Sequence, residues 1–203
     1  MVGLERFSKL EVRLKTSNNM PSTSVDPKMK GVYDALHKKF KGRQLLFGHG
    51  FVDAKLVVVG EAPVMHEETL KNMAPHSEKL LNQLLKSIGV NKNKVYFTTV
   101  LKHLPSPIKV PTSKEIKAYT PFLREELKMV EPTIVVTLGN LALNGIGLRQ
   151  PLANIHGRNF NFGSYELFPT FHPELALKSS EIKSLLEADF LKLKQLIESK
   201  KTV

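Results

Sequence analysis

Short runs of β-branched and other apolar residues recur along the chain and predict its strands. Three such runs cover residues 55–60, 94–100 and 133–139. Continuous apolar character over so few residues is typical of a strand that is buried on both faces. Residues 159–162 and 166–168 have the pattern of a hairpin, which predicts one more strand ahead of His172.

The stretches between these runs have the 3.6-residue period of amphipathic helices. The predicted helices cover residues 28–43, residues 77–88, a segment that opens at Thr112, a short segment near Leu141 and residues 180–199. Thr112 stands three residues before Glu115, which is the spacing of a capping box. Pro121 lies inside the same helix and is expected to kink it or split it in two.

Strands that alternate with helices predict an α/β fold, a three-layer α/β/α sandwich around a mostly parallel four-stranded sheet. In such sheets, ligands bind beyond the carboxyl ends of the strands, where the strand order reverses. The loops that follow the predicted strands cover residues 60–63, 99–107, 139–140 and 172–178. We expect these four loops to meet in one crevice.

The N-terminal part of the chain differs in character from the rest. Residues 9–15 alternate polar and apolar positions, which predicts a short strand. Residues 16–27 are rich in Ser, Thr, Asn and Pro, as loops and linkers are. We therefore expect an N-terminal arm or accessory strand at residues 1–27 and one main domain at residues 28–203.

The charge of the chain points to a class of ligand. Its 203 residues carry a formal net charge of +11, and the sequence pI is about 9.7. A field of this sign attracts polyanions, and phosphate backbones are their commonest form. A lysine-rich surface that is merely solvated is the alternative. DNA is the predicted partner, and we expect a monomer.

Other compositional features exclude whole classes of site. No run of apolar residues is long enough to span a membrane, and the first residues lack the apolar stretch of a secretory signal. We expect a soluble cytoplasmic protein, associated with the nucleoid if the source is prokaryotic. The chain contains no cysteine, which excludes disulfides, thiolate–zinc sites and cysteine-held clusters. The histidines lack the spacing of a zinc motif, so no cofactor is expected.

Two of the four loops carry residues that are suited to catalysis. Glu61 directly follows the strand at residues 55–60, and its carboxylate would orient a water or steady a developing cation. A polar turn residue that caps the strand is the alternative. The backbone of His172 is restricted by Pro173. Its imidazole would donate a hydrogen bond to a leaving-group oxygen, worth about 3–4 kcal/mol when preorganised. A lone histidine is, however, more often a structural side chain.

Two further segments suit contact with DNA. Leu175 and Leu177 form an apolar wedge that would enter a base stack, while Lys178 would meet a phosphate. A plain helix start explains these three residues equally well. Residues 102–109 form a basic loop stiffened by prolines, which would track a DNA backbone or serve only as an exposed connection.

Taken in order, short motifs in these loops resemble the uracil-DNA glycosylase superfamily, most of all its family 4, the thermostable iron–sulfur type. Residues 60–63 match the first four letters of the family's GEAPG motif. Residues 95–98 and 100–102 match the strand and the lysine of its VYITNVVKCRPP segment, and residues 169–173 closely match PTYHP. The resemblance runs from Phe47 to Lys192, and the order and spacing of the motifs make it specific.

The resemblance implies a monofunctional glycosylase of base-excision repair, which flips a deaminated base out of DNA and hydrolyses its N-glycosidic bond. It implies that His172 hydrogen-bonds the pyrimidine O2 and that Glu61 positions water, so these two are the predicted catalytic residues. The residues expected to form the base pocket are Gly60, Ala62, Pro63, Met73, His76 and Thr99. The residues expected to contact DNA are Lys102, Ser106, Gly139, Asn140, Arg158, Pro173, Leu175, Leu177 and Lys178.

The chain also departs from the family's pattern at functional positions. The cluster cysteines are absent, and His103 and Tyr119 stand at the two downstream positions. The asparagine that reads the uracil edge is Thr99 here, and a hydroxyl is shorter and less directional than an amide. Val64 replaces the last glycine of GEAPG. The family's PFVG segment, whose Phe stacks on the flipped base, is missing, and Met73 or His76 is expected to stack instead.

Three functions remain open on the sequence. The first is an active glycosylase that acts on uracil or a related deaminated base. The second is a DNA-binding or damage-recognising homologue with little or no catalysis, favoured by Thr99 and the missing stacking Phe. The third is a nucleotide-binding hydrolase that shares the sheet, although the chain has no phosphate-loop motif to favour it.

Overall fold

The computed structural model describes residues 26–106 and 110–201, and the chain divides into two compact units after Gln44. The described part of the first unit holds a 3-10 turn, η1 (Pro27–Met29), and a helix, α2 (Lys30–Lys39). Asp26 caps η1, because its carboxylate accepts a hydrogen bond from the Lys28 N–H at 2.8 Å. The strand predicted at residues 9–15 lies outside the described residues, and the N-terminal arm stays a prediction.

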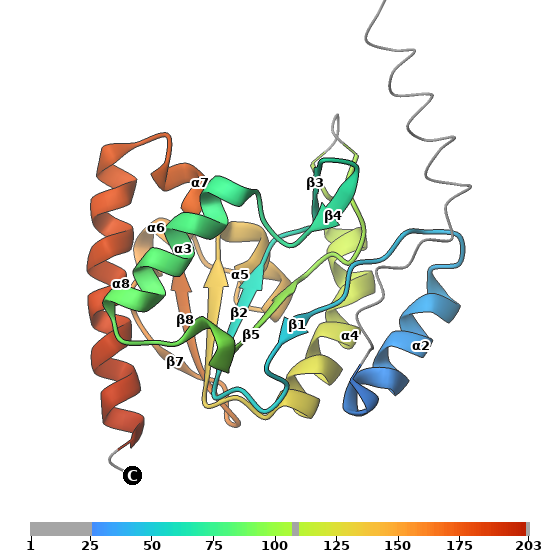
Figure 1. The fold of residues 1–203 in the computed structure, drawn as a ribbon, viewed down its shortest axis with the longest axis horizontal. Helices are drawn as coiled ribbons and strands as arrows, with labels where there is room; N and C mark the ends of the chain where they lie inside the picture. Colours follow the sequence, from blue (N-terminus) through green and yellow to red (C-terminus); the bar gives the residue numbers. More distant parts are fainter. Residues whose placement is uncertain (1–25, 107–109, 202–203) are drawn as a thin grey trace, which may run out of the picture. The chain divides into compact units, whose positions relative to one another are not determined.

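The second unit is built on a six-stranded sheet in the order β1-β5-β2-β6-β8-β7 (Figure 1). Its strands are β1 (His49–Gly50), β2 (Leu56–Gly60), β5 (Val95–Thr99), β6 (Ile134–Leu138), β7 (Phe160–Asn161) and β8 (Glu166–Thr170). The four central strands are parallel, and the two-residue edge strands β1 and β7 pair antiparallel to them. The predicted mostly parallel sheet of four strands is confirmed, with a short strand added at each edge.

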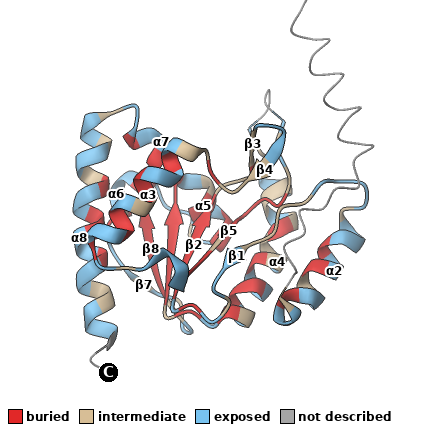
Figure 2. Ribbon diagram, viewed as in Figure 1, coloured by how far each residue is buried: buried red, intermediate tan, exposed pale blue. Residues whose placement is uncertain are grey.

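Helices cover both faces of this sheet, and the four central strands between them are almost entirely buried (Figure 2). The remaining elements are β3 (Val64–His66), β4 (Thr69–Lys71), α3 (Pro75–Ser87), η2 (Lys92–Lys94), α4 (Ser113–Val130), α5 (Asn140–Ile146), α6 (Leu152–Ile155), α7 (Pro173–Ala176) and α8 (Ser180–Lys201). Leu56 and Val58 of β2 join one apolar cluster with side chains of α3 and α8. Thr98 of β5 faces the other side and bonds Glu126 of α4. The result is the predicted α/β/α sandwich.

The order of the strands places the ligand site. From β2 the chain crosses to β5 on one side, and β6 then pairs with β2 on the other side. The connections that leave β2 and β6 therefore run in opposite directions, which is the switch point where open α/β sheets bind ligands. Glu61 follows β2 and Gly139 follows β6, so these residues flank the switch point.

Two features differ from expectation or were not foreseen. Pro121 does not split its helix, since α4 is continuous from Ser113 to Val130 and opens with the predicted capping box of Thr112 and Glu115. Pro121 is exposed, so the carbonyl that loses its partner can bond to water. The hairpin β3–β4 had no sequence signal, because its turn places Glu67 and Glu68 at positive φ, where Asn-Gly is the usual signature.

Among the described residues, no helix has the length and apolar character needed to cross a membrane.

Candidate active site

The loops that follow β2, β5, β6 and β8 are joined to one another at the carboxyl edge of the sheet. The N–H groups of Val100 and Leu101 donate to the carbonyls of Gly60 and Glu61, each at 3.1 Å. The Gly139 N–H donates to the carbonyl of Thr170 at 2.9 Å. These bonds join the loop after β2 to the loop after β5, and the turn after β6 to the end of β8. The four loops therefore share one edge of the sheet, and a crevice between them stays a prediction.

Glu61 lies at the centre of this edge. Its Oε1 accepts a hydrogen bond from the backbone N–H of Leu141 at 3.1 Å, at the start of α5. Burial raises the pKa of the Glu61 carboxyl, the Leu141 N–H opposes that rise, and the negative charge of Glu174 adds to it. Glu61 is therefore a carboxylate held at a cost, which favours it as an acceptor of protons.

Gly139 allows Glu61 to occupy this position. The backbone of Gly139 has φ +92°, in the region that favours glycine, and a Cβ built there would collide with the carboxylate of Glu61. The close approach of the β6–α5 turn to Glu61 thus depends on the missing side chain. Gly139 itself is buried, and its predicted contact with DNA stays a prediction.

His172 is the N-cap of α7, and this role fixes its tautomer. Its Nδ1 accepts a hydrogen bond from the backbone N–H of Glu174 at 3.2 Å. In the neutral ring the proton therefore sits on Nε2, which is left as a donor. Burial lowers the pKa of His172, although Glu174 opposes that shift. A neutral imidazole with a fixed Nε2–H is suited to donate a hydrogen bond to an oxygen that gains charge.

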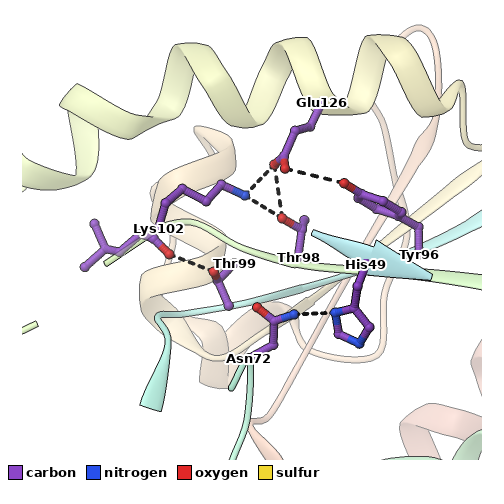
Figure 3. A network of polar contacts seen from close by, with 8 residues as sticks. His49, Asn72, Tyr96, Thr98, Thr99, Lys102 and Glu126 are labelled. Carbon is purple, nitrogen blue, oxygen red and sulfur yellow. Dashed lines mark hydrogen bonds and ion pairs between the residues drawn. The ribbon is translucent and has the colours of Figure 1, made fainter. Parts of the chain in front are cut away.

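The end of β5 forms the buried part of the predicted base pocket. Thr99 is 1% exposed, and its hydroxyl donates to the carbonyl of Leu101 at 2.7 Å (Figure 3). A Cβ added to Gly60 would lie 3.3 Å from Thr99 Cγ2, so these two residues are in close contact. Ala62 and Pro63 continue from Glu61 toward the β3–β4 hairpin. The hydroxyl proton of Thr99 is therefore used in a bond to the backbone and not directed at the predicted pocket.

Met73 and His76 differ in their availability for stacking on a base. Met73 is 8% exposed and belongs to the apolar cluster beneath α3 and α8. Its predicted stacking role does not fit this packing, because its side chain is taken up by the core. His76 is exposed in the first turn of α3 and stays a prediction.

Lys102 does not lie where a DNA contact requires it. Its side chain is fully buried, and Nζ forms an ion pair at 2.5 Å with the carboxylate of Glu126 on α4 (Figure 3). The side chain of Glu126 is fully buried as well. Thr98 donates to the same carboxylate at 3.0 Å. Burial lowers the pKa of Lys102, and Glu126 opposes that shift. The prediction that Lys102 contacts DNA is therefore wrong: its ammonium group anchors the end of β5 to α4.

The other residues predicted to contact DNA are mostly on the surface. Ser106, Asn140, Arg158 and Lys178 are exposed, and Leu175 and Leu177 are 48% and 51% exposed. Pro173 is buried as the first residue of α7. Lys178 forms an ion pair with Glu174 at 2.6 Å, one turn from His172. The structure thus brings the apolar wedge and a cation next to His172, and their contact with DNA stays a prediction.

Sequence reasoning missed the side chains that support the segment of His172. Asp189 on α8 is buried and accepts hydrogen bonds from Thr170 Oγ1 at 2.7 Å and from His156 Nδ1 at 2.9 Å. The ring of His156 packs against Phe171, with centroids 4.5 Å apart. Asp189 had no signal beyond its place in an amphipathic helix, because only the fold brings β8 and α8 together.

His103 and Tyr119, which stand at the two downstream cysteine positions of the family 4 pattern, form a bonded pair. His103 Nδ1 and the Tyr119 hydroxyl are 2.7 Å apart, and the two rings stack with centroids 5.3 Å apart. The described residues hold no group of three or more acidic, His or Cys side chains that would suit a metal ion. Since the chain also lacks cysteine, its residues do not fit a cysteine-held iron–sulfur cluster.

Comparison with known proteins gives a consistent family. The sequence model of the Uracil DNA glycosylase superfamily matches residues 47–193. The chain is 32% identical over 162 residues to the type-4 uracil-DNA glycosylase of Sulfurisphaera tokodaii, which covers 73% of each chain. It is 30% identical over 159 residues to the type-4 uracil-DNA glycosylase of Thermotoga maritima, covering 75% of this chain and 83% of the relative. A DNA polymerase of Bacillus phage SP01 is 27% identical to the chain over 155 residues, which cover 75% of this chain and 17% of the polymerase.

Proposed function

Because the chain belongs to the uracil DNA glycosylase superfamily, we propose that it is a monofunctional DNA glycosylase that removes a flipped deaminated base. The observation that carries this proposal is the meeting of Glu61 and His172 at one edge of the sheet. Glu61 accepts from the Leu141 N–H in the turn after β6, and the Gly139 N–H of the same turn donates to Thr170 ahead of His172. The negative charge of Glu174 acts to raise the pKa of both Glu61 and His172. Two groups of opposite chemical role, an acceptor and a donor, thus flank one switch point.

The chemistry of glycosidic hydrolysis assigns a role to each group. The bond between C1′ of the sugar and the base nitrogen breaks, and its electron pair goes to the base, where negative charge spreads to the ring oxygens. His172 donates from Nε2 to that oxygen, and a preorganised donor of this kind contributes about 10²–10³ in rate. The oxygen of a water molecule then bonds to C1′, and Glu61 orients this water and accepts its proton.

Binding to DNA is supported by charge and by the residues around His172. The net charge of +11 favours a polyanionic backbone. Leu175 and Leu177 occupy the space that the flipped base leaves. Lys178 binds a phosphate when its ion pair with Glu174 is replaced by a contact with the DNA backbone. The protein works without a cysteine-held cluster, and the pair of His103 and Tyr119 fixes the loop that follows β5 to α4 in its place.

A panel of lesions tests the activity. Labelled oligonucleotides that carry uracil, hypoxanthine or xanthine are incubated with excess protein, and abasic sites are then cleaved with alkali. Strand cleavage at one or more lesions supports the proposal. No cleavage at any lesion would refute it. Tight, salt-sensitive binding of the same oligonucleotides would then identify a damage-recognising homologue. This alternative is favoured by Thr99, whose hydroxyl already donates to the carbonyl of Leu101.

A further inference from the structure

The side-chain amide of Asn72 has a hydrogen-bond partner at its nitrogen but, among the described residues, none at its oxygen. It lies between β4 and α3, and its Nδ2 is hydrogen-bonded to Nδ1 of His49. Its Oδ1 is buried, and among the described residues it has no hydrogen-bond partner. Buried polar atoms in folded proteins are almost always paired, so an unpaired amide oxygen points to a ligand group that completes it.

This amide borders the predicted base pocket. A Cβ added to Gly60 would lie 3.3 Å from Thr99 Cγ2 and 3.8 Å from the backbone oxygen of Asn72, so both residues flank the same point at the end of β2. Figure 3 shows the Asn72 nitrogen directed at His49 and the oxygen on the side of Thr99. Asn72 is therefore placed beside the residue from which the family's reading amide is missing.

His49 holds this orientation. It pairs with Phe97 across β1 and β5, and its ring stacks on the ring of Phe97 with centroids 5.5 Å apart. When Nδ1 of His49 accepts, the amide nitrogen of Asn72 must face it, and the amide oxygen must face away from it. A ring fixed by both backbone pairing and stacking keeps the acceptor edge of Asn72 in one direction.

Thr99 is poorly placed for the same task. Its hydroxyl is its only polar side-chain group, and this group already donates to the carbonyl of Leu101. The amide oxygen of Asn72, in contrast, has no hydrogen-bond partner among the described residues.

We propose that Asn72 reads the edge of the flipped base through Oδ1 and that His49 is its positioning residue. This inference rests on the proposed function and defines its substrate class. Deamination turns N3 of cytosine and N1 of adenine from acceptors into N–H donors in uracil and hypoxanthine. A fixed acceptor bonds that N–H but opposes the lone pair of the unmodified ring nitrogen, so it selects bases with an N–H beside a carbonyl.

Binding of DNA that cannot be cleaved tests the inference. Oligonucleotides carry 2′-fluoroarabino derivatives of uridine or cytidine, which resist glycosidic hydrolysis, and the two Kd values are measured for each protein. The wild type should prefer the uracil DNA by about tenfold or more. Asn72→Ala and Asn72→Leu should reduce that preference to about twofold or less, while their affinity for DNA with an abasic analogue stays near that of the wild type.

Control variants separate a reading role from a structural one. Asn93→Ala changes an exposed asparagine in η2, at the opposite end of β5, and should retain the full preference. His49→Ala should weaken the preference, and His49→Asn, which offers an acceptor near the place of Nδ1, should restore it. These His49 variants also test the inference if both Asn72 variants fail to fold.

The result separates this inference from the proposed function. A preference for uracil DNA that depends on Asn72, in a protein that releases no base, supports the inference and refutes glycosylase activity. A wild type without preference overturns the inference, whether or not it cleaves. The inference is also overturned if the preference survives in folded Asn72→Ala, and its loss in Thr99→Val would then assign the reading of the base to Thr99.

Discussion

The carboxylate of Glu61 is bound to the backbone N–H of Leu141 at 3.1 Å, although 80 residues separate the two in the chain. The bond joins the loop after β2 to the first turn of α5, across the switch point of the sheet. It leaves the carboxylate only partly compensated for burial, because the pKa of Glu61 is still raised. The contact with Leu141 thus fixes the position of the carboxylate, whereas burial raises its pKa.

Glu61→Gln should raise stability and lower activity. A folded-state pKa above the unfolded value means that folding favours the protonated form, and that the ionised form costs stability as the pH rises through the folded pKa. Gln imitates the protonated form, so the variant should have the higher Tm at about pH 8, and the difference should shrink toward about pH 5. Base release should fall about 10²-fold or more. Thermal unfolding across this pH range and single-turnover kinetics measure the two effects, and an unchanged rate would remove Glu61 from the catalytic pair.

His172→Asn separates the two roles of His172. The amide oxygen of Asn can accept from the Glu174 N–H as Nδ1 does, so the cap of α7 and the Tm should be kept. The Nε2–H donor is lost, and the single-turnover rate should fall about 10²-fold or more. His172→Ala should lose the cap as well, at about 1 kcal/mol. Equal rates in wild type and His172→Asn would contradict the assignment.

Gly139→Ala should lower both stability and activity, although it adds only one methyl group. The added methyl group would stand on a backbone with φ +92° and ψ 172°, a region almost restricted to glycine, at a cost of about 1–3 kcal/mol, and it would displace the carboxylate of Glu61. We expect a lower Tm together with a loss of base release close to that of Glu61→Gln. Gly163→Ala is the matched control, because Gly163 also has positive φ but has open space where a Cβ would stand. If both variants lose only stability, the contact of Gly139 with Glu61 has no catalytic importance.

Lys102→Met should destabilise the fold strongly and leave the electrostatics of DNA binding alone. The variant leaves Glu126 buried without its cation, which typically costs about 3–5 kcal/mol. Adding Glu126→Gln should recover most of that loss, as urea unfolding would reveal.

Salt dependence of DNA binding provides the complementary measurement on the same surface. Affinity should fall steeply as salt rises, and Lys178→Ala, which removes an exposed cation beside His172, should lower the slope by about 1. The double variant Lys102→Met, Glu126→Gln should keep the wild-type slope, since Lys102 is buried. A reduced slope in that variant would place the Lys102 ammonium on DNA after all.

The sequence by itself determined the layers of the fold and the loops that carry the site. A strand buried on both faces needs a continuous apolar run, so the predicted ends of β2, β5 and β6 lie within one residue of the observed ends. Glu61 and His172 follow strands, and parallel strands must present their carboxyl ends at one edge, so their meeting followed from topology.

Only the tertiary structure decided which polar side chains stay at the carboxyl edge of the sheet and which are buried in ion pairs or in the core. Lys102 reads as a basic loop residue, yet it is buried because Glu126, 24 residues away, supplies the opposite charge. Met73 reads as a candidate for stacking, yet the core under α3 holds it. His49 and Asn72 give no signal in sequence, because a hydrogen bond between residues 23 apart depends on how β1 pairs with β5. Periodicity records burial against a neighbouring layer, whereas the partner of a single polar side chain is fixed only when distant segments pack together.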